Sequence, residues 1–106
     1  MIGSQCSGAL ILKKLGLLEG DPVCTDLITK PWVAETGVDV VDLPFYAHGN
    51  VATAGGCLSS QYLAAWMIAR LGNLEAARDA LHYIAQVGEK TEYVNRAMQN
   101  IAPFLS

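Results

Sequence analysis

The chain has 106 residues, 52% hydrophobic and only 16% charged, with a formal net charge of −3, so it allows one small domain with little charged surface. Because phosphate binding needs a basic surface and no Lys or Arg cluster exceeds the pair Lys13–Lys14, the composition argues against nucleic-acid binding. No apolar run is long enough to cross a bilayer and no charged signal region opens the chain, so we expect a soluble, cytoplasmic protein without membrane contact.

Short strands and short helices alternate along the first half of the chain. Glycines mark the predicted helix ends, and Pro31 fits a first helical turn. The segment 47–50 (AHGN) is predicted as a turn, and Pro44 is expected to interrupt strand pairing. In chain order we predict a strand over 2–5, a helix over 7–15 ended by Gly16, a strand over 23–25, a helix within 29–37 ended by Gly37, and strands over 38–41 and 51–54.

The second half is predicted to be helical. A helix over 57–71 is apolar on most faces, so we expect it to be buried, and Gly72 ends it. Asn73 and Thr91 are predicted to cap the two helices that follow. The residues expected to face inward are Leu74, Ala77, Leu81 and Ile84 in the first of these helices, and Tyr93, Val94, Ala97, Met98 and Ile101 in the second.

This order of elements predicts an α/β fold with a parallel sheet. Such a sheet needs helices on both faces, and about four short strands are too few for the apolar helices that must cover them. We therefore expect residues 1–106 to form a single truncated domain, whose apolar surface is covered by a partner or by a larger fold.

Cys6 lies at the junction between the first predicted strand and the first predicted helix. A sharp turn at this point exposes the sulfur, and a helix N-terminus favours negative charge on it. The backbone N–H of Ser7 then becomes a candidate donor to an oxyanion, and Gly8 keeps the turn uncrowded. On this short motif alone, a buried, inert cysteine is an equally good interpretation.

The remaining chemistry-bearing side chains are assigned structural roles. Cys24 and Cys57 are interpreted as small buried residues, since three widely spaced cysteines form neither a disulfide framework nor a zinc site. We expect no metal and no cofactor. The histidines are expected to face solvent and the tryptophans to fill the core or an interface: His48, His82, Trp32 and Trp66.

Four phrases in this order resemble the ThiJ/PfpI family of the class I glutamine amidotransferase-like superfamily. The stretch CSGALILKKLGLLEG is similar to the family's Cys-x-Gly-Ala elbow and to the helix that ends in Gly-Leu-Leu-x-Gly. VCTD is similar to a Thr-Thr-His-like strand end, and AHGNVATAGG to a hairpin that leads to Thr-Ala-Gly-Gly and a long apolar helix. The resemblance runs from about Ile2 to the final helix and is closest to the isonitrile hydratase-like branch.

The resemblance implies a flavodoxin-like, three-layer sandwich of which the chain matches only the C-terminal half. In the family the elbow strand is central. Earlier parts of the domain supply an acidic residue that partners the cysteine, together with a further backbone group of the oxyanion hole. Since the present sequence starts at the elbow strand, we expect the N-terminal strands and helices, and those groups with them, to lie outside it.

The sequence departs from the family pattern at Asp26. Many members place a histidine beside the cysteine, at the end of the Thr-Thr-His-like strand, and Asp26 stands at the matching position. An ionised carboxylate near a thiol raises the thiol pKa, which is the opposite of the effect of an imidazolium. Asp26 is instead a candidate proton carrier, provided that burial raises its own pKa.

The sequence leaves three functions open. The first is a truncated ThiJ/PfpI-like protein that is catalytically incomplete alone and self-associates, most simply as a homodimer. The second is a cysteine-dependent hydratase or hydrolase of the isonitrile hydratase type, with Cys6, Ser7 and Asp26 as candidate catalytic residues. The third is a chain that complements a separate N-terminal half-domain. No residue pattern identifies a substrate.

Overall fold

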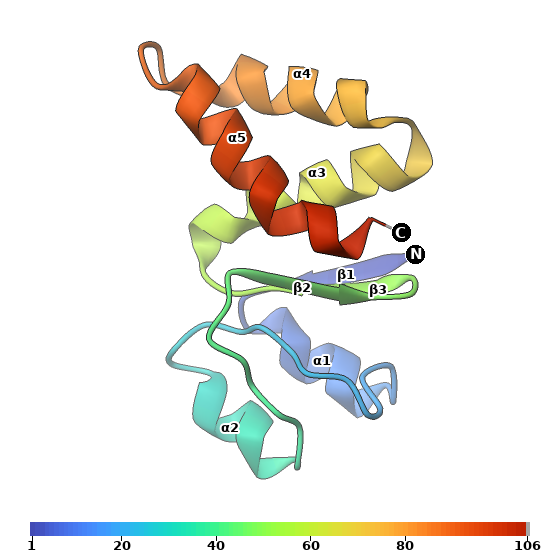
Figure 1. Ribbon diagram of the computed structural model, residues 1–106. Helices are drawn as coiled ribbons and strands as arrows, with labels where there is room; N and C mark the ends of the chain where they lie inside the picture. Colours follow the sequence, from blue (N-terminus) through green and yellow to red (C-terminus); the bar gives the residue numbers. More distant parts are fainter. Residues whose placement is uncertain (106) are drawn as a thin grey trace.

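The computed structural model describes residues 1–105, which form three layers (Figure 1). Its strands, helices and 3-10 helices (η) are β1 Ile2–Gln5, α1 Gly8–Lys14, α2 Lys30–Glu35, β2 Phe45–His48, β3 Val51–Ala54, η1 Cys57–Ser59, α3 Ser60–Leu71, α4 Leu74–Ile84, α5 Lys90–Ile101 and η2 Ala102–Phe104. The sheet lies in the middle, α1 and α2 lie on one face, and α3 and α5 lie on the other with α4 packed against them. Helices on both faces of the sheet confirm the predicted α/β class.

The sheet has three strands in the order β1-β3-β2. β1 runs parallel to β3, and β2 runs antiparallel to β3 through a hairpin that turns at Gly49 and Asn50. Gly49 has a φ of +60°, the left-handed conformation that such a two-residue turn requires. The predicted turn was too long, because Ala47 and His48 still pair with β3. Within the described residues, β1 is therefore an edge strand.

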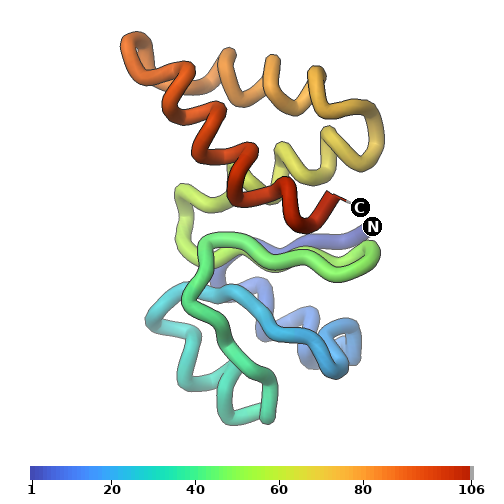
Figure 2. Tube along the Cα trace, in the orientation of Figure 1, coloured from blue at the N-terminus to red at the C-terminus, as the bar shows by residue number. Residues whose placement is uncertain are grey.

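The strands predicted over 23–25 and 38–41 are wrong. The structure has a single parallel bridge there, between Val23 and Val40. Next to this bridge, the Cys24 N–H donates to the Thr53 hydroxyl of β3 at 2.8 Å. In a regular sheet a backbone carbonyl of the neighbouring strand would accept this hydrogen bond. Between α1 and β2 the chain is mostly irregular apart from α2 (Figure 2).

The glycines end the two short helices as the sequence predicts. Gly16 follows α1 with a φ of +76°, and the N–H groups of Gly16 and Leu17 donate to the Lys13 and Leu12 carbonyls. This pairing satisfies two of the last carbonyls of the helix and reverses the chain. Gly37, also left-handed, follows α2, and its N–H donates to the Ala34 carbonyl.

The C-terminal helices agree with the prediction in position more than in detail. The helix predicted over 57–71 begins as η1 and continues as α3. Asn73 caps α4 through its side chain, as expected, whereas Glu89 rather than Thr91 precedes α5. The inward stripe of α5 is confirmed, but in α4 the outer members Leu74 and Ile84 are about half exposed.

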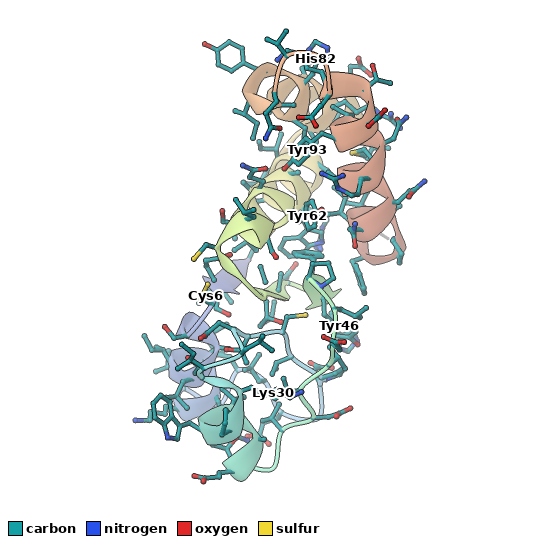
Figure 3. All side chains as sticks on the ribbon, turned by 90° about the vertical axis from the view of Figure 1, so that its left-hand side faces the viewer. Cys6, Lys30, Tyr46, Tyr62, His82 and Tyr93 are labelled. Atoms are coloured by element: carbon teal, nitrogen blue, oxygen red, sulfur yellow. The ribbon has the colours of Figure 1, made fainter. Side chains whose placement is uncertain are left out.

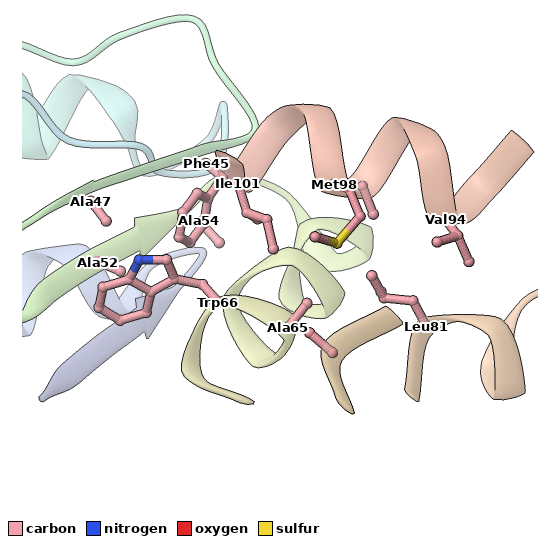
Figure 4. Close-up of a cluster of buried hydrophobic side chains, with 12 residues drawn as sticks. Phe45, Ala47, Ala52, Ala54, Ala65, Trp66, Leu81, Val94, Met98 and Ile101 are labelled. Atoms are coloured by element: carbon pink, nitrogen blue, oxygen red, sulfur yellow. The ribbon is translucent and has the colours of Figure 1, made fainter. Parts of the chain in front are cut away.

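The main core lies between the sheet and the C-terminal helices (Figure 4). Trp66 is fully buried there, with its ring 6.0 Å from that of Phe45, and its indole N–H donates to the Phe104 carbonyl at 2.8 Å. Leu58 and Leu71 are exposed near the two ends of the predicted 57–71 helix, so that helix is less buried than the sequence predicts. The buried members of this core are Phe45, Ala47, Ala52, Ala54, Ala65, Trp66, Ala77, Leu81, Val94, Ala97, Met98 and Ile101.

A smaller core lies on the opposite face of the sheet. Its buried members are four aliphatic side chains, Leu12, Leu18, Val23 and Val33. Trp32 of α2 is 57% exposed and does not join this core. The sequence predicted that it fills the core or an interface, and only the interface stays a prediction. None of the helices within residues 1–105 combines the length and the apolar character that a bilayer span requires.

Candidate functional site

Cys6 occupies a strained turn between β1 and α1. Its φ of +52° makes it the one non-glycine residue with a positive φ in the described part of the chain. Two hydrogen bonds hold this conformation: the Cys6 N–H donates to the Ala54 carbonyl at 2.9 Å, and the Thr25 hydroxyl donates to the Cys6 carbonyl at 2.9 Å. The backbone therefore makes the sharp strand-to-helix turn of a nucleophile elbow.

The thiol of Cys6 is partly exposed beside the end of the sheet. Figure 3 shows Cys6 at the level of the sheet, between the two helical layers, with His82 far from it. The N–H groups of Ser7 and Gly8 donate no hydrogen bond among the described residues, because they open the first turn of α1. Ser7 thus has the free donor that an oxyanion role needs, and the role itself stays a prediction.

The side chain of Gln5 links the two sides of the site. Its Nε2 donates to Cys6 Sγ at 3.1 Å and also to the Gly56 carbonyl, which precedes Cys57. Its Oε1 is buried and accepts no hydrogen bond within residues 1–105. Sequence reasoning missed Gln5, although its position as the last residue of β1 before the elbow was a usable signal.

Cys57 is the second thiol of the site, with its Sγ 3.8 Å from Cys6 Sγ. It is exposed at the start of η1, so the prediction that it is a buried structural residue is wrong. Gly56, with a φ of +94°, turns the chain after β3 and returns Cys57 to the end of β1. The hydrogen bond with Cys6 raises the pKa of the Cys57 thiol, and the charge of Cys6 and then that of Asp26 add to this.

Cys24 differs from both other cysteines. It is fully buried, as predicted, and burial raises the pKa of its thiol to about 11, against a smaller opposing effect of the hydrogen bond with Thr53. A thiol that stays protonated and inaccessible does not act as a nucleophile near neutral pH. Cys24 is therefore structural.

Gly55 lets three backbone segments meet beside the thiols. A Cβ at this position would lie 2.8 Å from the Thr25 carbonyl oxygen and 3.4 Å from the Leu43 carbonyl oxygen. Backbone atoms at such distances leave no room for a side chain. The glycine therefore brings the loops before α2 and before β2 to the end of β3.

Asp26 does not meet the condition for the predicted proton carrier. Its Oδ2 accepts from the Thr29 N–H at 3.1 Å, and hydrogen bonding to Thr29 lowers the pKa of the carboxyl despite some desolvation. A carboxyl with a lowered pKa is ionised near neutral pH and holds no proton to donate. Asp26 instead holds the loop that enters α2, and its charge acts on Cys57 from a distance.

A cleft of about 690 Å³ opens beside Asp26 and Gly56. Most of its lining surface is apolar, and its charged side chains are Asp26, Asp42 and Lys30. Cys6 is not part of the lining, and the cleft adjoins the thiol pair through Gly55 and Gly56 and through Thr25, whose hydroxyl donates to the Cys6 carbonyl. Its size and composition suit a small, mostly apolar molecule that carries a polar group.

The histidines lie away from the thiols and face solvent, as predicted. His48 pairs with Val51, at the opposite end of the sheet from Cys6, and its Nδ1 lies 2.8 Å from Asp21 Oδ1. His82 is exposed on α4. Within residues 1–105, no three His, Cys, Asp or Glu side chains gather as a metal site would require.

Comparison with known proteins gives matches only among solved structures. No protein-family model and no curated protein matches the chain. A ThiJ/PfpI family protein from Pseudomonas syringae matches with a TM-score of 0.68 and 22% identity, over 98% of this chain and 48% of that chain. DJ-1 of Schizosaccharomyces pombe matches with a TM-score of 0.51 and 18% identity, over 92% of this chain and 43% of that chain.

These matches agree with the fold described above. The chain spans just under half the length of both solved structures. Because the identities are low, the likeness concerns the arrangement of strands and helices rather than any activity. The chain has the fold of one half of a ThiJ/PfpI-type α/β sandwich.

Proposed function

We propose that this chain is the cysteine-bearing part of a ThiJ/PfpI family protein, catalytically incomplete as a 106-residue protomer and self-associating. The observation that carries the proposal is the open edge of β1, the strand that leads into Cys6. Ile2 and Cys6 donate their N–H groups to the β3 side. Since backbone groups alternate along a strand, those of Gly3 and Gln5 face the open edge, where they can pair with another strand.

Apolar side chains are also exposed on the segments that follow Cys6 and Cys57. Ile11 of α1 is 63% exposed, Leu15, which directly follows α1, is 64% exposed, and Leu58 of η1 is 83% exposed. Burying several hundred Å² of apolar surface at ~25 cal/mol per Å² contributes roughly 10 kcal/mol, which is comparable to the stability of a whole domain, about 5–15 kcal/mol. A second copy of the chain, related by a two-fold axis, can cover the open edge of β1 and these exposed side chains. We therefore expect a homodimer.

The site of the single protomer lacks a general acid or base. In the described part of the chain, the Cys6 sulfur has only the Gln5 amide and the Cys57 thiol as hydrogen-bond partners. The Asp26 carboxyl is ionised and engaged with Thr29. Because general acid–base catalysis contributes ~10²–10⁴ in rate, we expect little or no turnover from the chain alone.

Two measurements on the 106-residue chain test this proposal. Sedimentation at micromolar concentration, with native mass spectrometry, is expected to give the mass of two protomers. Formamide production from simple isonitriles, and consumption of glyoxal-type carbonyls, are expected to stay at the buffer rate. A compact, cooperatively folding monomer would contradict self-association, and a robust turnover would contradict catalytic incompleteness.

The second candidate is a cysteine-dependent hydratase or hydrolase of the isonitrile hydratase type. The strained Cys6 elbow, the free Ser7 N–H and the adjacent cleft favour it. In that reaction the Cys6 sulfur adds to the terminal carbon of the isonitrile, and that carbon takes up the thiol proton to give a thioimidate. Water then adds to the same carbon, the C–S bond breaks, and the formamide and the free thiol are released. Turnover that disappears in Cys6→Ser and persists in Cys24→Ser would support this candidate. Turnover that appears only after an N-terminal half-domain is added would support complementation by that half.

A further inference from the structure

The pair of thiols at the elbow has a chemistry that the proposed function does not use. Cys6 and Cys57 are 51 residues apart in the chain, yet their sulfurs lie 3.8 Å apart at the surface. We propose that Cys6 and Cys57 form a redox-active dithiol that reduces hydroperoxides and closes to an intramolecular disulfide. This inference does not rest on self-association or on hydratase activity.

The geometry allows the disulfide to form with a local movement. An S–S bond is about 2.05 Å long, so the two sulfurs, now 3.8 Å apart, must approach each other by about 2 Å. Cys57 is exposed and follows two glycines, and a Cβ on Gly56 would meet only Ser59 Oγ, at 3.8 Å. The Gln5 amide binds both Cys6 Sγ and the Gly56 carbonyl, so it keeps the two cysteine backbones together during the movement.

The two thiols have distinct roles in this pair. The pKa of the Cys57 thiol is raised, chiefly by its hydrogen bond with Cys6, so Cys57 keeps its proton more firmly than an ordinary thiol and is the weaker nucleophile of the pair. Cys6 is therefore the sulfur that attacks the peroxide, and Cys57 is the sulfur that resolves the product. Cys24 takes no part, because it is fully buried and its thiol has a pKa of about 11.

The cycle balances in atoms and electrons. The Cys6 thiolate attacks the terminal oxygen of a hydroperoxide ROOH, the O–O bond breaks, and the leaving alkoxide takes a proton to give ROH and Cys6 sulfenic acid. The Cys57 sulfur then attacks the Cys6 sulfur, and the sulfenic oxygen leaves as water with the Cys57 proton. The peroxide gains two electrons, and the thiol pair loses two. Two equivalents of a small thiol restore the dithiol and form their own disulfide.

Stoichiometric hydrogen peroxide on the reduced chain, followed by alkylation and non-reducing peptide mapping, tests the proposal. We expect a peptide that joins Cys6 to Cys57 within one chain, with Cys24 still a free thiol. In Cys57→Ser we expect dimedone-reactive sulfenic acid on Cys6 and over-oxidation to sulfinic acid that is roughly tenfold greater than in the wild type. The matched control is Cys24→Ser, which is expected to form the Cys6–Cys57 link as the wild type does.

Several outcomes would overturn the proposal. These are sulfinic acid on Cys6 of the wild type without any link, a link between Cys6 residues of two chains, or equal over-oxidation in the wild type and in Cys57→Ser. Equilibration of the wild type in glutathione redox buffers needs no variant and decides the question if Cys57→Ser does not fold. A two-electron transition that joins Cys6 to Cys57 supports the proposal, and a dithiol at every buffer ratio rejects it.

Discussion

The two faces of the sheet are covered in different ways. The face under α3 and α5 has twelve buried apolar residues in its core, and long helices cover it. The face under α1 and α2 has only four buried apolar residues in its core. The loops before and after α2 are joined by a single bridge, between Val23 and Val40, and the Cys24 N–H donates to a side chain of the sheet. The site lies where these two layers meet, because Cys6 leads into α1 and Cys57 precedes α3.

This difference indicates which layer depends on further contacts. A core of about twelve side chains can stabilise a small domain, whereas four aliphatic side chains offset little of the entropy lost by ordering two short helices and their loops. The α1–α2 layer also exposes Leu27 and Ile28, which line the cleft. We infer that the C-terminal helical layer carries most of the stability, and that the α1–α2 layer is stabilised by association.

The largest expected effect compares the two tryptophans. Trp66→Ala removes the largest buried side chain of the main core, its contact with Phe45 and its hydrogen bond to Phe104. We expect the free energy of unfolding, measured by urea denaturation, to fall by about 3–5 kcal/mol. Trp32→Ala is the matched control in the other layer and is expected to cost less than about 1 kcal/mol, since that side chain is mostly exposed.

The control also provides the outcome that would break the comparison. An equal loss in Trp32→Ala and Trp66→Ala would show that the α1–α2 layer contributes as much to stability as the C-terminal helical layer. If Trp66→Ala does not fold at all, Trp66→Phe keeps most of the apolar volume but removes the indole N–H. It should still be clearly less stable than the wild type, because the Phe104 carbonyl loses its donor.

The next effect concerns association rather than unfolding. Ile11→Lys and Leu15→Lys each place a charge on the exposed apolar face that α1 and the residue directly after it form. If a second copy covers this face, each substitution acts twice in a two-fold dimer, and we expect the dissociation constant to rise at least about tenfold, or ~1.4 kcal/mol. Sedimentation equilibrium over a concentration series measures this shift.

Val87→Lys is the control for the association experiment. Val87 is 92% exposed between α4 and α5, on the layer that needs no further cover, so its substitution should leave the dissociation constant unchanged. A dimer weakened by Val87→Lys and not by Ile11→Lys would move the interface to the C-terminal helical layer. The roles of the two layers would then be reversed.

Much of the fold follows from local signals in the sequence. Gly16 and Gly37 end helices and Asn73 caps one, because left-handed backbone and side-chain caps depend on a few adjacent residues. The strands predicted over 23–25 and 38–41 failed for the opposite reason. An apolar run is compatible with a strand, but whether its backbone pairs with another strand depends on residues that are distant in the sequence. Here the Cys24 N–H donates to the Thr53 hydroxyl instead of to a strand carbonyl.

In the site, too, the features set by neighbouring residues were predictable and those set by distant residues were not. The Cys6 turn was predictable, since the elbow, its glycine and the following helix lie within a few residues. The closeness of Cys57 was not, because it depends on β3 lying directly beside β1. The state of the Asp26 carboxyl depends likewise on Thr29, whose N–H is positioned only once α2 has formed.

The smallest expected effect tests how the α1–α2 layer is held at its loop. The folded-state pKa of Asp26 is lowered from its ordinary 3.8, so its hydrogen bonding with Thr29 stabilises the protein above about pH 4 and is lost as the pH falls through the lowered pKa. In Asp26→Asn this part of the pH dependence is expected to disappear, so that urea denaturation at pH 7 and near pH 3 shows a smaller difference than in the wild type. Asp79→Asn, which changes an exposed carboxylate of α4, should keep the wild-type dependence. If Asp26→Asn and the wild type lose stability equally on acidification, the Thr29 contact does not hold the loop, and the weaker layer depends on association alone.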